Sequence, residues 1–139
     1  MSSDSLFKDA RAVATAWLTA CTHHEPFADA PGYVAWTYSR DARHNGTLEL
    51  IDDPELSQGR NRFAVSVTLE LPPVRSVEDA LVLFNLADWL DGITVVTKEF
   101  GAEGALMLQK KGALADFSEA TLNAVFRDLA EAKKYFEEL

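Results

Sequence analysis

The chain has 139 residues, of which 47% are hydrophobic, and its 22 Asp and Glu against 13 Lys and Arg give a formal net charge of −9. This length predicts one domain with a single core, over residues 1–139. The acidic balance excludes a surface built to neutralise phosphates, so we expect neither nucleic acid nor a membrane as a partner. A single cysteine excludes an internal disulfide. No run of about 18 apolar residues and no apolar leader in "MSSDSLFKDA" is found, which predicts a cytoplasmic protein.

The first expected element is an amphipathic helix over residues 4–22. Its apolar positions recur at spacings of three and four and form one stripe. They are Leu6, Ala10, Val13, Ala14, Trp17, Leu18 and Cys21. "EPFADAPG" follows and predicts a loop, because Pro26 and Pro31 cannot continue a helix.

Three strands are expected next, over residues 33–39, 47–51 and 63–71. The third alternates large apolar side chains with Ala, Ser, Thr and Glu, which predicts one buried face and one wet or partly covered face. Between the first two strands, "RHNG" contains Asn45 and Gly46, a pair that predicts a tight hairpin turn with positive φ angles.

The remaining sequence predicts two helices that flank a hairpin. Ser76 is positioned to cap a second helix, which Gly92 would end in the left-handed conformation. Strands over 93–100 and 105–110 then enclose the turn "GAEG", and Ser118 caps a final helix. The order α-β-β-β-α-β-β-α belongs to the α+β class, with a mostly antiparallel five-stranded sheet and three helices.

The expected second helix contains "ALVLFNLADWLDG", which is apolar nearly all round. Such a helix has to be buried on more than one face, and the sheet covers one. Each large side chain left in water would forgo about 1.5–3 kcal/mol of burial free energy. Two candidates would cover the second face: another helix of the same chain, or the same helix of a second copy across a two-fold axis.

Chemistry-bearing motifs are sparse. "CTHH" brings together Cys21, His23 and His24, but its spacing does not match a zinc site, and no complementary motif lies elsewhere. The pairs Asp52/Asp53 and Glu137/Glu138 are typical of solvated charge, because acid/base work requires two carboxylates in different environments. No phosphate-binding or nucleophile motif is present. We therefore expect no enzyme, no metal and no cofactor.

Aromatic residues concentrate in the first helix and the first strand. Trp17, Tyr33, Trp36 and Tyr38 fit two interpretations. Most of them are core residues, or some of them line a groove that receives an extended or helical peptide beside an open sheet edge. The pattern leaves both open.

The order of elements, the size and the acidity resemble the class I type III secretion chaperones, the CesT/Tir-chaperone group. The residues that carry the resemblance are a Leu-rich helix with an Asn, a two-strand hairpin with "ALMLQ" and the Ser-capped last helix, within residues 78–139. The resemblance implies a homodimer and the binding of the unfolded N-terminal segment of a secreted effector, which the chaperone keeps secretion-competent. The YbjN-type proteins share this fold, so a regulatory or peptide-binding module without a secreted client is the alternative.

The resemblance also implies two sets of site residues. The dimer interface would contain Val82, Leu86, Trp89 and Leu90 of the second helix. The partner-binding surface would contain Val13, Trp17, Trp36 and Leu48, from the first helix and the sheet.

Overall fold

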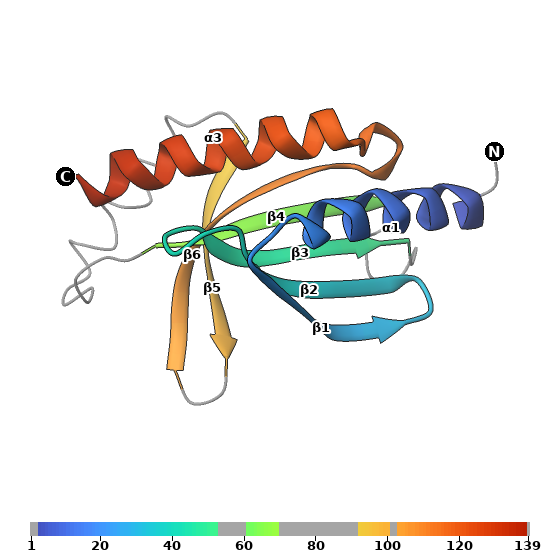
Figure 1. Cartoon of the computed structure of the whole chain (residues 1–139), viewed down its shortest axis with the longest axis horizontal. Helices are drawn as coiled ribbons and strands as arrows, with labels where there is room; N and C mark the ends of the chain where they lie inside the picture. Colours follow the sequence, from blue (N-terminus) through green and yellow to red (C-terminus); the bar gives the residue numbers. More distant parts are fainter. Residues whose placement is uncertain (1–2, 53–60, 70–91, 101–102, 139) are drawn as a thin grey trace.

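The computed structural model describes residues 3–52, 61–69, 92–100 and 103–138. These form a six-stranded sheet with two long helices on one of its faces (Figure 1). The elements are α1 (Ser3–Thr19), β1 (His23–Ala30), β2 (Tyr33–Ser39), β3 (Asn45–Ile51), β4 (Arg62–Thr68), β5 (Ile93–Phe100), β6 (Glu103–Ala113), the short 3-10 helix η1 (Leu114–Asp116) and α3 (Glu119–Glu137). The strand order is β1-β2-β3-β4-β6-β5, and all neighbouring strands are antiparallel. The predicted α+β class is confirmed.

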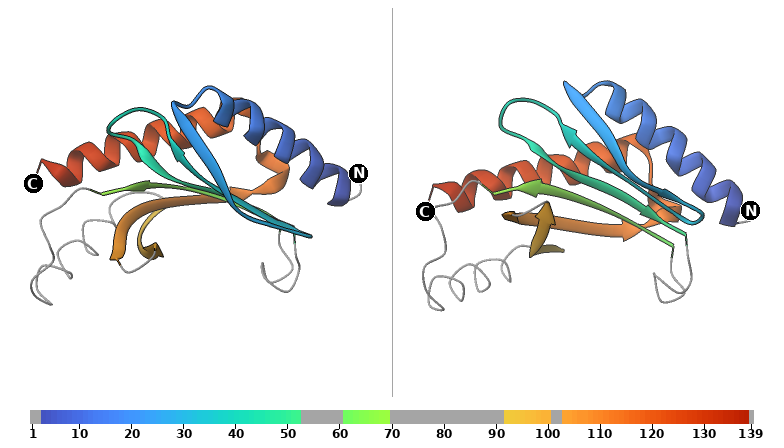
Figure 2. Two further views of the ribbon diagram at one scale, coloured as in Figure 1. Left: turned by 60° about the horizontal axis from the view of Figure 1, so that its bottom comes forward. Right: turned by 90° about the horizontal axis from the view of Figure 1, so that it is seen from below.

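Both helices pack on the same face of the sheet, α1 against β1 and β3 and α3 against β4 and β6 (Figure 2). Every second side chain of the central strands faces them, as strand geometry requires. On β2 these are Val34, Trp36 and Tyr38, which join the main hydrophobic cluster. The strands and helices contribute the following fully buried large side chains to it: Leu18, Val34, Leu48, Leu50, Phe63, Leu108, Leu114, Leu122, Leu129 and Phe136. This side of the sheet is called the helix-covered face below.

The last helix follows its sequence pattern closely. The Ser118 hydroxyl accepts a hydrogen bond from the backbone N–H of Thr121 at 3.1 Å, so the predicted cap is confirmed. The predicted stripe is also confirmed: Leu122, Val125, Leu129 and Phe136 are buried, and Phe126 is partly buried against the core. Local chemistry therefore suffices to define α3.

The predicted turn at Asn45 and Gly46 is wrong, because both residues lie inside β3. The turn comes earlier, where the Asp41 carboxylate accepts hydrogen bonds from the backbone N–H groups of Arg43 and His44 at 2.8 and 3.0 Å. Gly46 serves a different purpose. A Cβ atom there would lie 1.8 Å from the carbonyl oxygen of Ser66, so only glycine permits this close approach of β3 and β4.

The prediction of five strands is also wrong, because the segment predicted as a loop contains β1. All its residues except Ala28 are exposed, so neither face of this edge strand carries an apolar pattern. Pro31 and Gly32 form the turn to β2, and Gly32 has the positive φ of 78° that the third position of a type II turn requires.

The other predicted elements are confirmed with shifts at their ends. The strands expected over 47–51, 63–71 and 105–110 are Asn45–Ile51, Arg62–Thr68 and Glu103–Ala113. The first helix ends at Thr19, three residues earlier than expected. Gly92 has the predicted left-handed conformation, with φ of 73°. The helix expected between Ser76 and Gly92 lies outside the described residues.

Candidate partner-binding surface

Small, uncharged polar side chains are frequent in the middle of the sheet face away from the helices. Cross-strand pairing places Thr37 opposite Thr47, Thr47 opposite Ser66, and Ser66 opposite Gln109. Directly opposite residues project from the same face of an antiparallel pair. We call the following set the polar face: Thr37, Ser39, Asn45, Thr47, Ser66, Thr68, Met107 and Gln109. None of these members carries a charge, but the same face continues with the charged residues Glu49, opposite Ala35 and Ala64, and Lys111, opposite Ala64.

The centre of the polar face is closed by hydrogen bonds among its own groups. Thr47 and Ser66 are 1% and 0% exposed, and their hydroxyl oxygens lie 2.6 Å apart. The backbone N–H of Thr47 donates to Ser66 Oγ at 3.1 Å, and Ser66 Oγ lies 3.7 Å from the Met107 sulfur. On the helix-covered face, the Tyr38 hydroxyl donates to the Ser66 carbonyl oxygen at 2.8 Å. Buried polar groups in the middle of the sheet thus satisfy one another.

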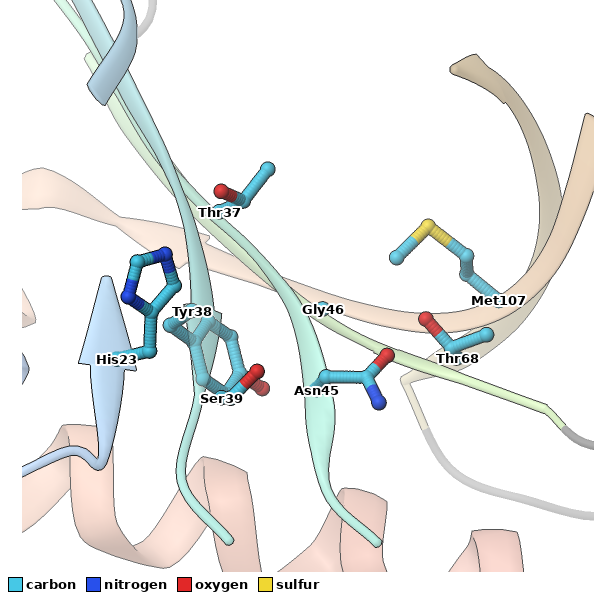
Figure 3. A pocket seen from close by; sticks show the side chains of 8 residues that line it. All are labelled: His23, Thr37, Tyr38, Ser39, Asn45, Gly46, Thr68 and Met107. Carbon is cyan, nitrogen blue, oxygen red and sulfur yellow. The ribbon is translucent and has the colours of Figure 1, made fainter. Parts of the chain in front are cut away.

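At one end of the polar face the sheet forms a hollow of 260 Å³ (Figure 3). Thr37 of β2 and Met107 of β6 project into this space from its two sides. Residues from five strands line it: His23, Thr37, Tyr38, Ser39, Asn45, Gly46, Thr68 and Met107. Among the described residues, the lining contains hydroxyl, amide, imidazole and thioether groups and no carboxylate, ammonium or guanidinium group.

Strand β1 forms one edge of the sheet, and no described element pairs with its outer side. Its register shifts between Pro26 and Ala28, so Phe27 is the extra residue of a bulge, and its side chain is 48% exposed. A bulge and a proline are features with which natural edge strands limit uncontrolled pairing. The part from His23 to Pro26 and the part after the bulge are therefore two short, separate stretches of open edge.

An ion pair ties α1 to this edge. The two guanidinium nitrogens of Arg11 lie 3.2 and 2.8 Å from the two carboxylate oxygens of Asp29, which is a bidentate geometry. Both side chains are largely exposed. The hydrogen bond to Arg11 holds the pKa of Asp29 below its ordinary value. The pair fixes the position of β1 against the helix rather than adding much stability.

The four residues predicted to contact a partner lie at the interface of α1 and the sheet. Trp17, Trp36 and Leu48 are buried in the core, whereas Val13 is partly buried. Trp17 Nε1 donates to Asn123 Oδ1 at 3.0 Å, which joins α1 to α3. In the free chain these three side chains take part in packing, and their contact with a partner stays a prediction about a complex.

Trp17 is the centre of an aromatic cluster. Tyr38 and Phe126 pack edge-on against it, with ring centroids 5.1 and 5.6 Å away. The Arg40 guanidinium lies 4.6 Å from its ring and donates to its carbonyl oxygen at 3.2 Å, at the negative end of α1. Of the two interpretations left open for the aromatic residues, the core interpretation holds for Trp17, Trp36 and Tyr38.

Cys21 and the neighbouring histidines do not form a reactive or metal-binding group. The Cys21 thiol is half-buried beside Arg40, and burial raises its pKa, which disfavours the thiolate. His23 and His24 are exposed on β1. Within the described residues, no group of three His, Cys, Asp or Glu side chains is close enough to hold a metal ion.

The predicted dimer residues Val82, Leu86, Trp89 and Leu90 lie outside the described residues. Their role stays a prediction from the sequence pattern.

The comparisons with known proteins give one informative result. No protein-family model and no curated protein matches the sequence. Among solved structures, a chain of the HopA1–SchA chaperone–effector complex matches with a TM-score of 0.63. The likeness covers 100% of this chain and 99% of the other, at 16% sequence identity. The two chains share a fold. The fold that the resemblance to the secretion chaperones implied is therefore confirmed.

In the part of the chain that the structure describes, no helix is both long and apolar enough to cross a membrane.

Sequence reasoning missed two features of this surface, the open strand β1 and the hollow. The hollow joins side chains from strands that are distant in sequence, so only the register reveals it. One signal was present, namely the repeated Thr and Ser at alternate positions of the strands, such as Thr37 and Ser39, and Ser66 and Thr68. Such short hydroxyl side chains differ from the charged residues usual on a solvated sheet face.

Proposed function

We propose that this protein is a non-enzymatic chaperone of the cytoplasm that binds the N-terminal segment of a secreted effector and keeps it secretion-competent. The observation that carries the proposal is the shared fold with a chain of a chaperone–effector complex over the whole length of both chains. Fold alone does not define function, so the surface has to supply the binding site.

The surface supports binding of an extended segment at β1. An open strand edge offers backbone N–H and C=O groups to an incoming strand, and neighbouring side chains supply specificity. Phe27 is exposed on this edge, and the partly buried Val13 lies on α1, which packs against β1. A client bound over this region would remove apolar surface from water, and such binding requires no catalytic group.

A homodimer is the second part of the proposal, and it rests on the sequence. The expected second helix is apolar nearly all round, and one sheet face cannot cover all of its apolar residues. The residues left for a second covering surface are Val82, Leu86, Trp89 and Leu90. We predict that Leu86→Asp yields a monomer or an aggregate in sedimentation experiments, because a charge would be forced into an apolar interface without a partner. A native protein that sediments as a monomer would contradict the dimer.

The client is tested by co-purification from the native host with the tagged full chain. Support requires that a captured protein is exported and that deletion of its N-terminal segment abolishes capture. Phe27→Lys should weaken capture about tenfold, the equivalent of one buried apolar contact. Tyr135→Lys is the matched control, because Tyr135 is 50% exposed but lies on α3.

The opposite outcome has a definite meaning. A dimer that captures no exported protein under conditions in which secretion is active would contradict the chaperone proposal. It would favour the alternative, a YbjN-like regulatory or peptide-binding module without a secreted client.

A further inference from the structure

A second hollow, of 340 Å³, lies where β4 begins and β6 ends, at the opposite end of the sheet face that carries the polar face. Arg62 pairs directly with Ala113, and Lys111 with Ala64. Because these positions alternate with the core residue Phe63, Arg62 and Lys111 project from the face away from the helices. We call this space the basic hollow, and its lining residues are Asn61, Arg62, Lys111, Gly112 and Ala113.

Small residues leave the basic hollow open. Ala113, directly opposite Arg62, adds only a methyl group, and Gly112 adds no side chain. A Cβ atom at Gly112 would lie 2.5 Å from the Phe63 ring, so this ring occupies the space on the helix-covered side of Gly112. Two long cationic side chains therefore border a space whose other lining residues are short.

The two cations of the basic hollow are close to each other and have no counter-charge. Arg62 and Lys111 are diagonal neighbours on adjacent strands, positions that lie about 7–8 Å apart. Neither forms an ion pair with a residue that the structure describes, whereas Arg11, Lys110 and Lys133 each pair with a carboxylate. Such a pair of cations stands out in a chain with 22 acidic and 13 basic residues.

The carboxylate of Glu49 lies on the same sheet face but interacts elsewhere. It accepts a hydrogen bond from the hydroxyl of Tyr33, on the strand at its other side. Glu49 does not line the basic hollow, and neither does any other carboxylate of the described residues. A negative group from another molecule would therefore meet two cations there and no like charge in the lining.

A phosphate group matches this arrangement in charge and geometry. A phosphate monoester carries a charge of about −1.5 to −2 at pH 7 and three strong acceptor oxygens, whereas one carboxylate would neutralise only one of the two cations. The planar guanidinium of Arg62 fits two phosphate oxygens, and the ammonium of Lys111 acts as a point charge. The side-chain amide of Asn61 can add a neutral donor. The volume of 340 Å³ lies at the small end of the range of about 300–1,000 Å³ for small-molecule sites.

We propose that the basic hollow binds one phosphate group of a small molecule, with Arg62 and Lys111 as its cationic ligands and Asn61 as a neutral donor. The proposal goes beyond the proposed function and does not rest on it, because the site requires no protein client. The acidity of the whole chain does not oppose it, since physiological salt screens exposed charges over about 8 Å.

The test titrates inorganic phosphate, glycerol phosphate and acetate into the full-length protein at constant ionic strength. Backbone N–H signals of Gly112 and Ala113 in NMR spectra report on the basic hollow, and the signal of Gly46, at the other end of the sheet face, is the internal control. We expect phosphate to shift the first two signals saturably, with an affinity at least about tenfold above that of acetate. Tighter binding of glycerol phosphate would assign the site to a phosphate ester, and tighter binding of inorganic phosphate to the free ion.

Two substitutions remove the cations one at a time. Arg62→Gln and Lys111→Gln should each weaken phosphate binding about tenfold, because each removes one charge-assisted contact. Arg127→Gln and Lys134→Gln are the matched controls, since they make the same change in net charge at exposed positions of α3. Each control should change the affinity by less than about twofold. The second hollow variant and the dispersion of the spectra guard against misfolding of the first.

Three results would overturn the proposal: no saturable shift at Gly112 or Ala113, equal affinities for phosphate and acetate, or equal weakening in the hollow variants and the controls. Each of these results would leave the chaperone function standing, because its test measures capture of an exported protein.

Discussion

The two faces of the sheet are both well buried at their centres, but they achieve burial in different ways. The helix-covered face presents large apolar side chains such as Leu48 and Phe63, which pack against α1, α3 and η1. The polar face presents short, buried side chains such as Thr47 and Ser66, whose hydroxyl groups are hydrogen-bonded to each other. Apolar packing stabilises the helix-covered face, whereas hydrogen bonds between polar side chains join the strands on the polar face.

The largest effect should come from the residue that lets β3 and β4 approach each other. Gly46→Ala would place a Cβ atom 1.8 Å from the Ser66 carbonyl oxygen and 2.6 Å from its carbon, so the backbone would have to move. We expect the free energy of unfolding to fall by about 4 kcal/mol or more, which urea denaturation would measure. Gly92→Ala is the control, since a Cβ there meets only Lys110 at 3.5 Å, and its positive φ costs about 1–2 kcal/mol. Equal losses in the two variants would contradict the importance of the close approach.

The helix-covered face should show the next largest effect. Leu129 is fully buried in the stripe of α3, and Leu129→Ala would leave a cavity in the core. We expect a loss of about 3 kcal/mol, within the usual range for such changes. Thr94→Ala, at an exposed position of β5, should change stability by less than about 0.5 kcal/mol. A small loss at Leu129 would mean that α3 contributes little to the core.

On the polar face a smaller effect is expected, because hydrogen bonds rather than volume are at stake. Ser66→Ala removes the acceptor for the backbone N–H of Thr47 and the hydroxyl partner of its side chain. Leaving these buried groups without partners should cost about 1–2 kcal/mol. Thr37→Ala is the control, since the Thr37 hydroxyl makes one long, exposed hydrogen bond of 3.4 Å. If Ser66→Ala were neutral, the polar face would not depend on its internal hydrogen bonds.

The contrast between the faces also explains how far the sequence could predict this protein. α3 was predicted well, because the Ser118 cap and the apolar stripe are local signals. β1 was missed, because an edge strand exposed on both faces has no alternating pattern. The role of Gly46 depends on Ser66, twenty residues away, and an Asn-Gly pair alone predicts a turn equally well. The aromatic residues could not be assigned to core or groove, since that choice depends on where α1 and α3 lie.

The smallest expected effect concerns a pair outside the helix-covered core. Burial and the nearby Glu49 carboxylate, to which the Tyr33 hydroxyl donates a hydrogen bond, raise the pKa of Tyr33 from 10.0 to about 12. Because the folded state holds the phenol proton more tightly than the unfolded state, the stabilisation is complete below pH 10 and is lost as pH rises toward 12. Tyr33→Phe lacks this contribution, so its stability deficit should narrow across that window.

The measurement is denaturant unfolding of the native protein and Tyr33→Phe at a series of pH values. Since the Tyr33 side chain is partly exposed, solvent screening should keep the change in the gap below about 1 kcal/mol. A gap that stayed constant from neutral pH to pH 12 would show that the interaction with Glu49 does not couple to folding. A narrowing gap would show that the face opposite the helices contributes a small amount to stability through the Tyr33–Glu49 pair.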